Sequence, residues 1–160
     1  MKHPMRILQG LKLVAVLAVA LSMGACANKN AATDAMANAA TPGSQQDFVV
    51  NVGDRVFFES DQTDLTPQAI VTLEKQAQWL QSYPRYSFTV EGHADERGTR
   101  EYNLALGERR AQAVVNYLTA LGIDAGRVKE VSYGKEKPIC PDATDACWGQ
   151  NRRGVTALDN

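Results

Sequence analysis

The sequence has no excess of basic residues. Three of its 17 Lys and Arg residues precede Cys26, so the chain from Cys26 onward carries 14 of them against 18 Asp and Glu residues. A nucleic-acid-binding protein needs a surplus of positive charge to neutralise phosphates, and this balance offers none. We therefore expect no nucleic-acid partner.

A long apolar run is also missing. The longest, Leu13–Leu21, has nine residues, whereas a membrane-spanning helix needs roughly 20. Basic residues precede this run and small residues follow it, as in a secretory signal peptide. The pattern predicts a cleaved signal over residues 1–25 and disfavours the alternative, a retained transmembrane anchor.

The residues before Cys26 are Met23, Gly24 and Ala25, and they resemble the lipobox of bacterial lipoproteins. The resemblance implies that the Cys26 thiol is alkylated by a diacylglycerol and becomes the mature amino terminus. Several acyl chains, palmitate among them, at roughly 0.8 kcal/mol per buried methylene would anchor the chain stably. Met23 replaces the usual leucine, so cleavage by an ordinary signal peptidase is the alternative. In bacterial lipoproteins an aspartate just after the cysteine tends to retain the protein in the inner membrane; here Ala27 and Asn28 follow Cys26, so the resemblance implies delivery to the outer membrane.

Cysteines are scarce, and only Cys140 and Cys147 remain beyond Cys26. In an exported protein such a pair is expected to form a disulfide. The alternative is a metal site, but two cysteines without a further cysteine or a nearby histidine make a poor zinc set. We therefore expect a small disulfide-closed loop and no metal.

Large apolar residues are absent from positions 27–46 except for Met36. A segment of this composition cannot bury enough surface to fold. We interpret residues 26–46 as the lipidated cysteine and a flexible linker, with an r.m.s. span of roughly 25 Å. The folded domain is then expected over residues 47–160.

The rest of the chain alternates strand and helix patterns. Thr66 and Pro67 are typical of a helix start, and apolar residues then recur at three- and four-residue spacing. Gly122 is placed to end a second helix. The expected strands cover residues 55–59, 86–92, 128–133 and 153–158, and the expected helices cover 67–82 and 103–121. This order predicts an α/β (α+β) sandwich, β-α-β-α-β-β, in which two helices pack on one face of a mixed sheet.

The densest polar cluster lies between the second strand and the second helix, over residues 92–99 and onward to Arg110. Rigid elements hold such a loop on both sides, and the amino terminus of a helix favours anionic ligands. Arg110 lies seven residues after Asn103, so both can share a helix face that turns back toward the loop. We expect Asp95 and Arg110 to face each other across a shallow pocket and to hold a zwitterion.

The run from Gly92 to Ala111, with residues 132–136 and 151–153, resembles the OmpA-like domain of peptidoglycan-associated lipoproteins over about residues 56–158. The resemblance implies noncovalent binding to the peptidoglycan stem peptide, in which Asp95 and Arg110 grip diaminopimelate. It further implies contacts from Asp61, Thr99, Asn103, Leu106 and Arg152 or Arg153. Ser60 departs from the aromatic residue of many relatives at that position.

The same resemblance implies a periplasmic domain that tethers the outer membrane to the cell wall within a Tol-Pal system. That system serves envelope integrity and cell division during the cell cycle. The implied partners are a TolB-like propeller, which competes for the peptidoglycan surface, and other Tol proteins. No cofactor is implied.

Other interpretations remain open at this point. Asp95 would cap a turn, Arg110 would pair with Glu96 or Glu108, and Arg109 would be a solvated neighbour. His93 is more typical of a scaffold than of a catalytic base. A cell-wall enzyme would use Glu91, His93, Asp95 and Glu96, but no activated serine or cysteine nucleophile accompanies them. A purely structural surface lipoprotein is the third alternative.

Overall fold

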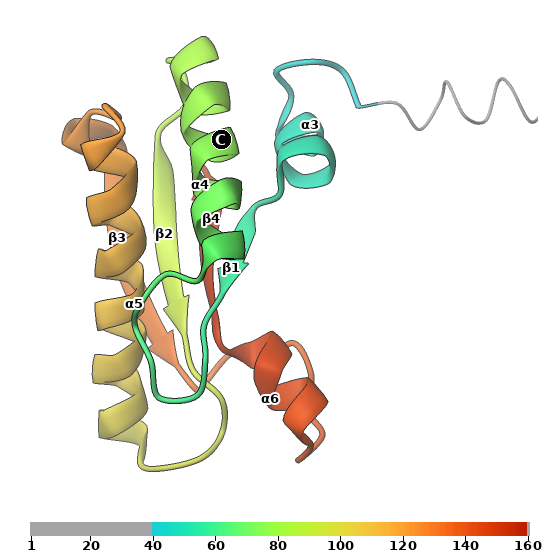
Figure 1. The fold of residues 1–160 in the computed structure, drawn as a ribbon, viewed down its shortest axis with the longest axis vertical. Coiled ribbons are helices and arrows are strands. Elements are labelled where there is room, and N and C mark those ends of the chain that lie inside the picture. The colour runs from blue at the N-terminus through green and yellow to red at the C-terminus, as the bar shows by residue number, and fades with distance from the viewer. Residues whose placement is uncertain (1–39, 160) are drawn as a thin grey trace, which may run out of the picture. The chain divides into compact units, whose positions relative to one another are not determined.

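The computed structural model describes residues 40–159, which form one sheet with helices around it (Figure 1). The strands are β1 (Arg55–Phe57), β2 (Phe88–His93), β3 (Val128–Gly134) and β4 (Arg153–Leu158). The two long helices are α4 (Pro67–Ser82) and α5 (Arg100–Ala120). Short helical segments complete the described chain: α3 (Gln45–Asp47), η1 (Phe48–Val52), η2 (Ala125–Arg127) and α6 (Asp145–Asn151).

The sheet is mixed, with the strand order β1-β4-β2-β3. The last strand of the chain lies inside the sheet, antiparallel to both β1 and β2, while β3 runs parallel to β2. The predicted α/β sandwich with a mixed sheet is confirmed. One consequence is that the carboxyl end of β2 and the amino end of β4 meet at one edge, where Gly92 pairs with Gly154.

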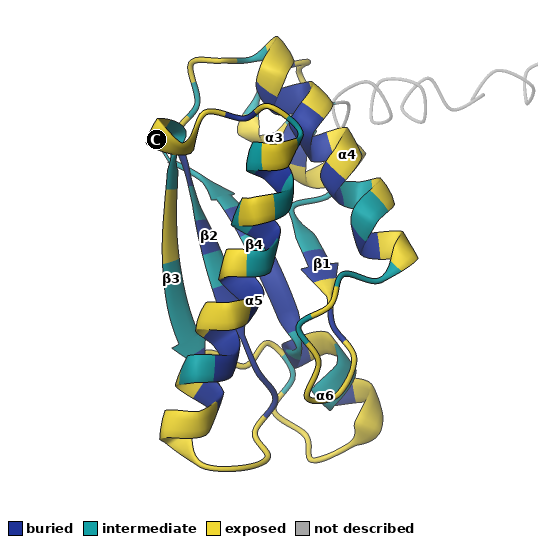
Figure 2. Cartoon of the chain, turned by 60° about the vertical axis from the view of Figure 1, so that its left-hand side comes forward, coloured by how far each residue is buried: buried dark blue, intermediate teal, exposed yellow. Residues whose placement is uncertain are grey.

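Helices α4 and α5 cover the same face of the sheet (Figure 2). Thr66 caps α4 by accepting a hydrogen bond from the amide of Ala69, as the sequence predicts. The apolar stripe of α4 packs inward on Phe88 and Val90, both fully buried in the central strand. Burial of each such side chain contributes about 1.5–3 kcal/mol, so this contact holds the helix layer on the sheet. The buried members of the stripe are Ala69, Leu73, Ala77 and Leu80.

Helix α5 approaches β2 closely at two glycines. A Cβ atom on Gly92 would overlap the carbonyl oxygen of Gly107, and one on Gly107 would overlap the Ser132 hydroxyl. Only glycine permits this backbone contact. It fixes the first turns of α5 directly beside the loop that follows β2.

The observed elements differ from the predicted ones mainly at caps and in loops. Helix α5 begins at Arg100, three residues before the predicted Asn103, because the Thr99 hydroxyl accepts from the amide of Tyr102 and starts the helix there. Helices α3 and α6 were not predicted. They contain too few apolar residues to show helical periodicity.

Residues 41–46 belong to the folded part, although we expected them in the linker. The carbonyl of Gly43 accepts a hydrogen bond from the Tyr86 hydroxyl at 2.9 Å and another from Arg85. Asp47 accepts from the indole of Trp79 at 2.8 Å, and Phe48 packs on the same ring. Most of these contacts are hydrogen bonds from distant residues, so the low apolar content of residues 41–46 did not predict that they are ordered.

The predicted signal peptide (1–25), Cys26 and the part of the predicted linker up to residue 39 lie outside the described residues. Within residues 40–159, no helix has the length and apolar character needed to cross a membrane.

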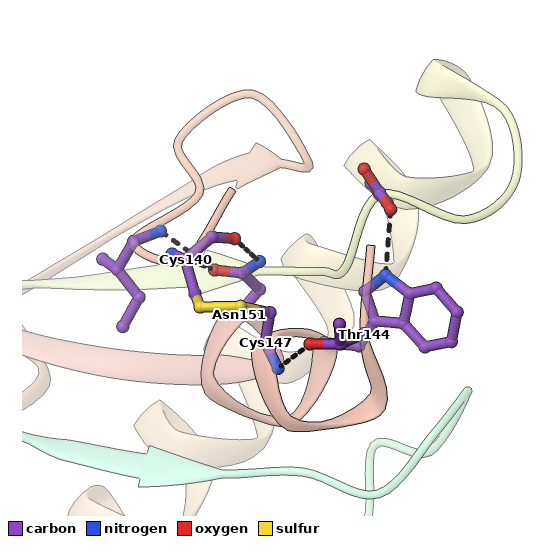
Figure 3. Close-up of a disulfide and its surroundings, with 7 residues drawn as sticks. Cys140, Thr144, Cys147 and Asn151 are labelled. Atoms are coloured by element: carbon purple, nitrogen blue, oxygen red, sulfur yellow. Dashed lines mark hydrogen bonds between the residues drawn. A yellow bond between two sulfur atoms is a disulfide. The ribbon is translucent and has the colours of Figure 1, made fainter. Parts of the chain in front are cut away.

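Cys140 and Cys147 form the predicted disulfide, with Cα atoms 5.0 Å apart (Figure 3). Metal binding by cysteine requires thiolates, which the bridge consumes. The metal alternative is therefore not supported. The bridge joins the loop after β3 to the first turn of α6, and the Asn151 side chain reinforces it by hydrogen bonds to the Cys140 backbone.

Candidate functional site

A surface cavity of about 280 Å³ opens between the loop after β1 and the loop that joins β2 to α5. Its wall combines two carboxylates, one guanidinium, neutral polar groups and one leucine. The lining residues are Ser60, Asp61, Asp95, Arg97, Gly98, Tyr102, Asn103 and Leu106. Four of the seven predicted peptidoglycan-binding residues are among them: Asp61, Asp95, Asn103 and Leu106.

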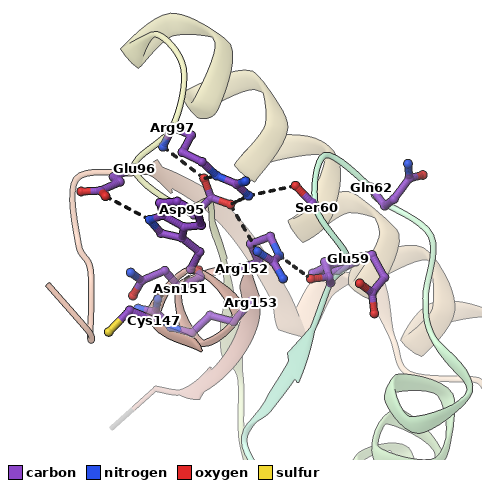
Figure 4. Close-up of polar contacts among 12 residues, drawn as sticks. Glu59, Ser60, Gln62, Asp95, Glu96, Arg97, Cys147, Asn151, Arg152 and Arg153 are labelled. Atoms are coloured by element: carbon purple, nitrogen blue, oxygen red, sulfur yellow. Dashed lines mark hydrogen bonds and ion pairs between the residues drawn. The ribbon is translucent and has the colours of Figure 1, made fainter. Parts of the chain in front are cut away.

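Asp95 is the central carboxylate of this cavity and is only 7% exposed (Figure 4). Arg97 binds both carboxylate oxygens of Asp95: its Nε donates to Oδ1 at 3.0 Å and its Nη2 donates to Oδ2 at 2.7 Å. The amide of Arg97 also donates to Oδ1, and Arg152 approaches Oδ2 at 3.4 Å. Burial alone would raise the pKa of Asp95, but the hydrogen bonds from Arg97 outweigh it and the pKa is lowered.

Arg97 connects the two loops that border the cavity. Beyond Asp95, its Nη2 donates to the Ser60 hydroxyl at 2.9 Å. Its guanidinium lies over the ring of Trp148, with the Cζ atom 4.3 Å from the ring centroid. The accessible cation beside Asp95 is therefore Arg97, whose side chain is 43% exposed.

Arg110 does not face the solvent, so the expectation that it lines an open pocket opposite Asp95 is wrong. It is fully buried, and its guanidinium donates to the carbonyls of Gln62 at 2.9 Å, His93 at 2.8 Å and Glu59 at 3.1 Å. Burial first, and then the charge of Arg152, lowers the pKa of Arg110 to about 10, so it remains a cation at neutral pH. Its partners are these carbonyls and not the carboxylates of Glu96 or Glu108.

The reason for this placement lies in the chain after β1. Residues 59–62 lie between β1 and α4, where the amide of Gln62 donates to the carbonyl of Glu59 at 3.2 Å. The fork of guanidinium donors on Arg110 joins the carbonyls of Glu59 and Gln62 to that of His93 at the end of β2. Arg110 thus holds the loop that forms one wall of the cavity.

The remaining predicted residues shape the loop after β2. Asn103 is buried and donates to the carbonyls of Arg97 at 2.7 Å and Thr99 at 3.0 Å. Thr99 caps α5 and is not a lining residue. Asp61 is exposed in a left-handed conformation (φ 57°) and accepts a hydrogen bond from the Tyr102 hydroxyl.

The two arginines after α6 have separate roles. Arg152 donates to the carbonyl of Phe58 at 2.9 Å and approaches Asp95, so it contacts both loops that border the cavity. Arg153 is 4% exposed and donates to backbone carbonyls of Asn151 and Lys137. Arg152 is thus the arginine of this pair that belongs to the candidate site.

Arg97, Tyr102 and Trp148 were not assigned to the site from the sequence. Arg97 lies two residues after Asp95, a spacing at which a side chain can fold back on a loop carboxylate, and this was an available signal. Trp148 is 52 residues away from Glu96, whose carboxylate accepts from its indole at 3.0 Å. No local pattern predicts that contact.

His93 lies outside the cavity. It is buried, and its Nε2 is 3.3 Å from a carboxylate oxygen of Glu91. Burial lowers its pKa to about 4, with further lowering by Arg153. Of the four residues of the enzyme alternative, Asp95 lines the cavity, Glu91 and His93 contact each other on β2, and Glu96 accepts from Trp148.

Comparisons with known proteins identify the family. The model of the OmpA family matches residues 57–152. The chain is 52% identical to the peptidoglycan-associated lipoprotein of Agrobacterium fabrum, over 97% of this chain and 92% of that protein. It is 55% identical to that of Rhizobium meliloti, over 89% of this chain and 84% of the relative.

Solved structures agree with this result. The crystal structure of the peptidoglycan-associated lipoprotein from Burkholderia pseudomallei superposes with a TM-score of 0.64 at 40% identity, over 66% of this chain and 90% of that one. The C-terminal domain of Helicobacter pylori MotB shares the fold, with a TM-score of 0.63 at 23% identity over 67% of this chain and 84% of the other. The chain belongs to the OmpA family and, within it, to the peptidoglycan-associated lipoproteins.

Proposed function

We propose that this protein binds peptidoglycan noncovalently and that the cavity around Asp95 takes the diaminopimelate side chain of a stem peptide. The observation that carries the proposal is the pairing of Asp95 with Arg97 in an open cavity. The side chain of diaminopimelate in a stem peptide ends in a carbon that carries both an ammonium and a carboxylate. A carboxylate and a guanidinium side by side are the complement of such a zwitterion.

Each charged residue has a role in this proposal. Asp95, with Asp61 across the cavity, accepts hydrogen bonds from the ammonium. Arg97 is the accessible donor for the ligand carboxylate. Arg110 supports the cavity without lining it, because it holds residues 59–62 in place. It would touch the ligand directly only if that loop opened. Arg152 keeps the Asp95 carboxylate oriented.

Neutral groups complete the recognition. Leu106 offers the apolar surface for the methylene chain of diaminopimelate, and Asn103 and Thr99 hold the loop after β2 in shape. Ser60 stands where many relatives have an aromatic residue, so this wall relies on its hydrogen bond from Arg97 in place of ring packing.

The cellular role in this proposal is a tether. A lipid on Cys26 anchors the chain in the outer membrane, the segment up to residue 39 spans the distance to the cell wall, and the domain faces the periplasm. As part of a Tol-Pal system, the protein would exchange peptidoglycan for a TolB-like propeller at the same surface. Envelope integrity and constriction at cell division would depend on that exchange.

Binding is tested by sedimenting the full chain with purified sacculi in the presence of competing muropeptides. We expect a diaminopimelate muropeptide to displace the protein at a much lower concentration than a lysine muropeptide. Lysine keeps the ammonium but lacks the adjacent carboxylate. Equal displacement by both would show that diaminopimelate is not the group recognised.

The site assignment is tested with Asp95→Asn, which keeps the shape and removes the charge. We expect it to abolish sedimentation with sacculi, while the matched control Glu101→Gln, an exposed acid in the first turn of α5, binds as the wild type does. A TolB-like propeller should compete with sacculi for the wild-type chain. Simultaneous binding of both would rule out a shared surface.

A further inference from the structure

Trp148 on α6 contacts the loop that follows β2 at two points. Its ring lies under the guanidinium of Arg97, and its indole nitrogen donates to Oε1 of Glu96 at 3.0 Å. The two contacted residues, Glu96 and Arg97, directly follow Asp95 in the sequence. The ring itself is only half-buried and is not a lining residue of the cavity.

This contact restrains the cation of the site. An arginine side chain that is 43% exposed has many accessible rotamers, and ordering it when a ligand binds costs entropy. A guanidinium that lies on an aromatic face is attracted by the ring quadrupole. With Trp148 on one side and Asp95 on the other, Arg97 is already in its bidentate geometry before a ligand arrives.

The position of Trp148 depends on the disulfide-closed loop. Helix α6 has seven residues, too few to be stable by itself. The Cys140–Cys147 bridge ties its first turn to the preceding loop. The Asn151 side chain ties its last turn to the same loop through the amide of Ile139 at 2.9 Å and the carbonyl of Cys140 at 2.7 Å.

We propose that Trp148 is a positioning residue of the peptidoglycan site, and that the Cys140–Cys147 bridge holds α6 so that Trp148 keeps Arg97 on Asp95. The inference rests on the proposed function and adds to it a support that lies outside the cavity. It assigns a role in binding to the disulfide, which otherwise only closes a surface loop.

The first test replaces Trp148 in the full chain and measures the affinity for a soluble diaminopimelate muropeptide. We expect Trp148→Leu to bind about tenfold more weakly, in the range of cation–π interactions that are partly shielded from water. Trp148→Phe restores a ring under Arg97 and should recover most of that loss. Glu101→Gln, the exposed acid in the first turn of α5, is the control and should bind as the wild type does.

The second test removes the bridge with Cys140→Ser and Cys147→Ser together. We expect a loss of affinity similar to that of Trp148→Leu, and no further loss when the two changes are combined, because both act through Arg97. Additive losses, or wild-type affinity in the bridge variant, would overturn the proposal. Thermal unfolding of each variant shows whether it is folded. If Trp148→Leu does not fold, the affinity of the bridge variant still tests the proposal.

A spectroscopic measurement separates positioning from a general effect on folding. In a Trp79→Phe background, Trp148 is the one tryptophan left in the chain. Its fluorescence should change when the muropeptide binds, and Arg97→Ala should remove that change. If wild-type protein does not bind the muropeptide at all, the proposed function fails. If it binds while folded Trp148→Leu binds equally well, only the positioning role fails.

Discussion

Arg97 donates to both carboxylate oxygens of Asp95, at 3.0 Å to Oδ1 and 2.7 Å to Oδ2, from only two residues along the chain. This local pair places an accessible positive charge directly beside a mostly buried negative one. The pair is therefore balanced in charge, which suits a zwitterionic ligand better than a simple cation or anion. The pair also separates the roles of Arg97 and Arg110, since Arg97 is accessible and Arg110 is sealed.

Arg97→Ala should weaken muropeptide binding by about tenfold, because a bidentate charge-assisted donor is lost from the cavity. The pKa of Asp95 should also rise, because the hydrogen bonds that lower it come first from Arg97. Calorimetric titration and NMR of the Asp95 carboxyl group measure these two effects. Arg100→Ala removes an exposed arginine that pairs with Glu136 at 3.0 Å, and it should change neither quantity.

Arg110→Ala should lower the free energy of unfolding by about 3 kcal/mol, since three carbonyls lose a charged donor and one fully buried side chain leaves a void. Urea denaturation measures the change. Arg109→Ala alters the exposed neighbour on the same helix and should stay within about 0.5 kcal/mol of the wild type. If both variants were equally stable, Arg110 would not hold residues 59–62, and its role in the proposed site would have to be direct.

Stability should fall as the pH drops from 6.5 toward 4, because of His93. Burial lowers its pKa to about 4 in the folded chain, whereas the unfolded chain binds the proton near the ordinary value of 6.5. The unfolded state therefore binds more protons in this window, and the free energy of unfolding decreases by up to about 3 kcal/mol.

Urea denaturation across that window measures the slope, which His93→Gln should flatten. The other histidine, His3, lies outside the described residues. Asp95 has a lowered pKa, so its contribution to stability is lost only at a more acidic pH, as the pH falls through that folded-state value. A slope that is unchanged in His93→Gln would contradict the assignment.

Gly92→Ala should unfold the domain or lower its melting temperature severely, because the added methyl group would overlap the backbone of Gly107. Neither partner of this contact is a flexible side chain, so α5 would have to move away from β2. Differential scanning calorimetry measures the change. Gly126→Ala, where the nearest atom to the added methyl is 3.3 Å away on the Asp124 side chain, should cost far less.

The fold could be predicted closely because its signals are local. Thr66 and Pro67 mark the start of α4, alternation marks β2, and Arg153–Leu158 is a strand as expected. The pairing of Cys140 with Cys147 followed from the cysteine count once Cys26 was assigned to the lipid and the chain to an exported protein. The order of the strands, in which β4 lies between β1 and β2, carries no local signal and was not predicted.

The candidate site was predicted less completely. Asp95, Asp61, Asn103 and Leu106 do lie together at one cavity. The exposure of Arg110 was predicted wrongly, because helical spacing gives the face on which a residue lies and not what covers that face. The covering segment, residues 59–62, comes from a different part of the chain, and its carbonyls at Glu59 and Gln62 accept hydrogen bonds from the Arg110 guanidinium.

Local chemistry in the sequence thus determined the two long helices, the strands, the disulfide partners and the loop that carries Asp95, since each depends on residues within a few positions of one another. Only the tertiary structure decided which arginine meets Asp95 in the open, which is buried behind it, and that Trp148 lies beneath Arg97. Those outcomes depend on how three loops from separate parts of the chain pack at one edge of the sheet, and contacts of that range leave no periodicity in the sequence.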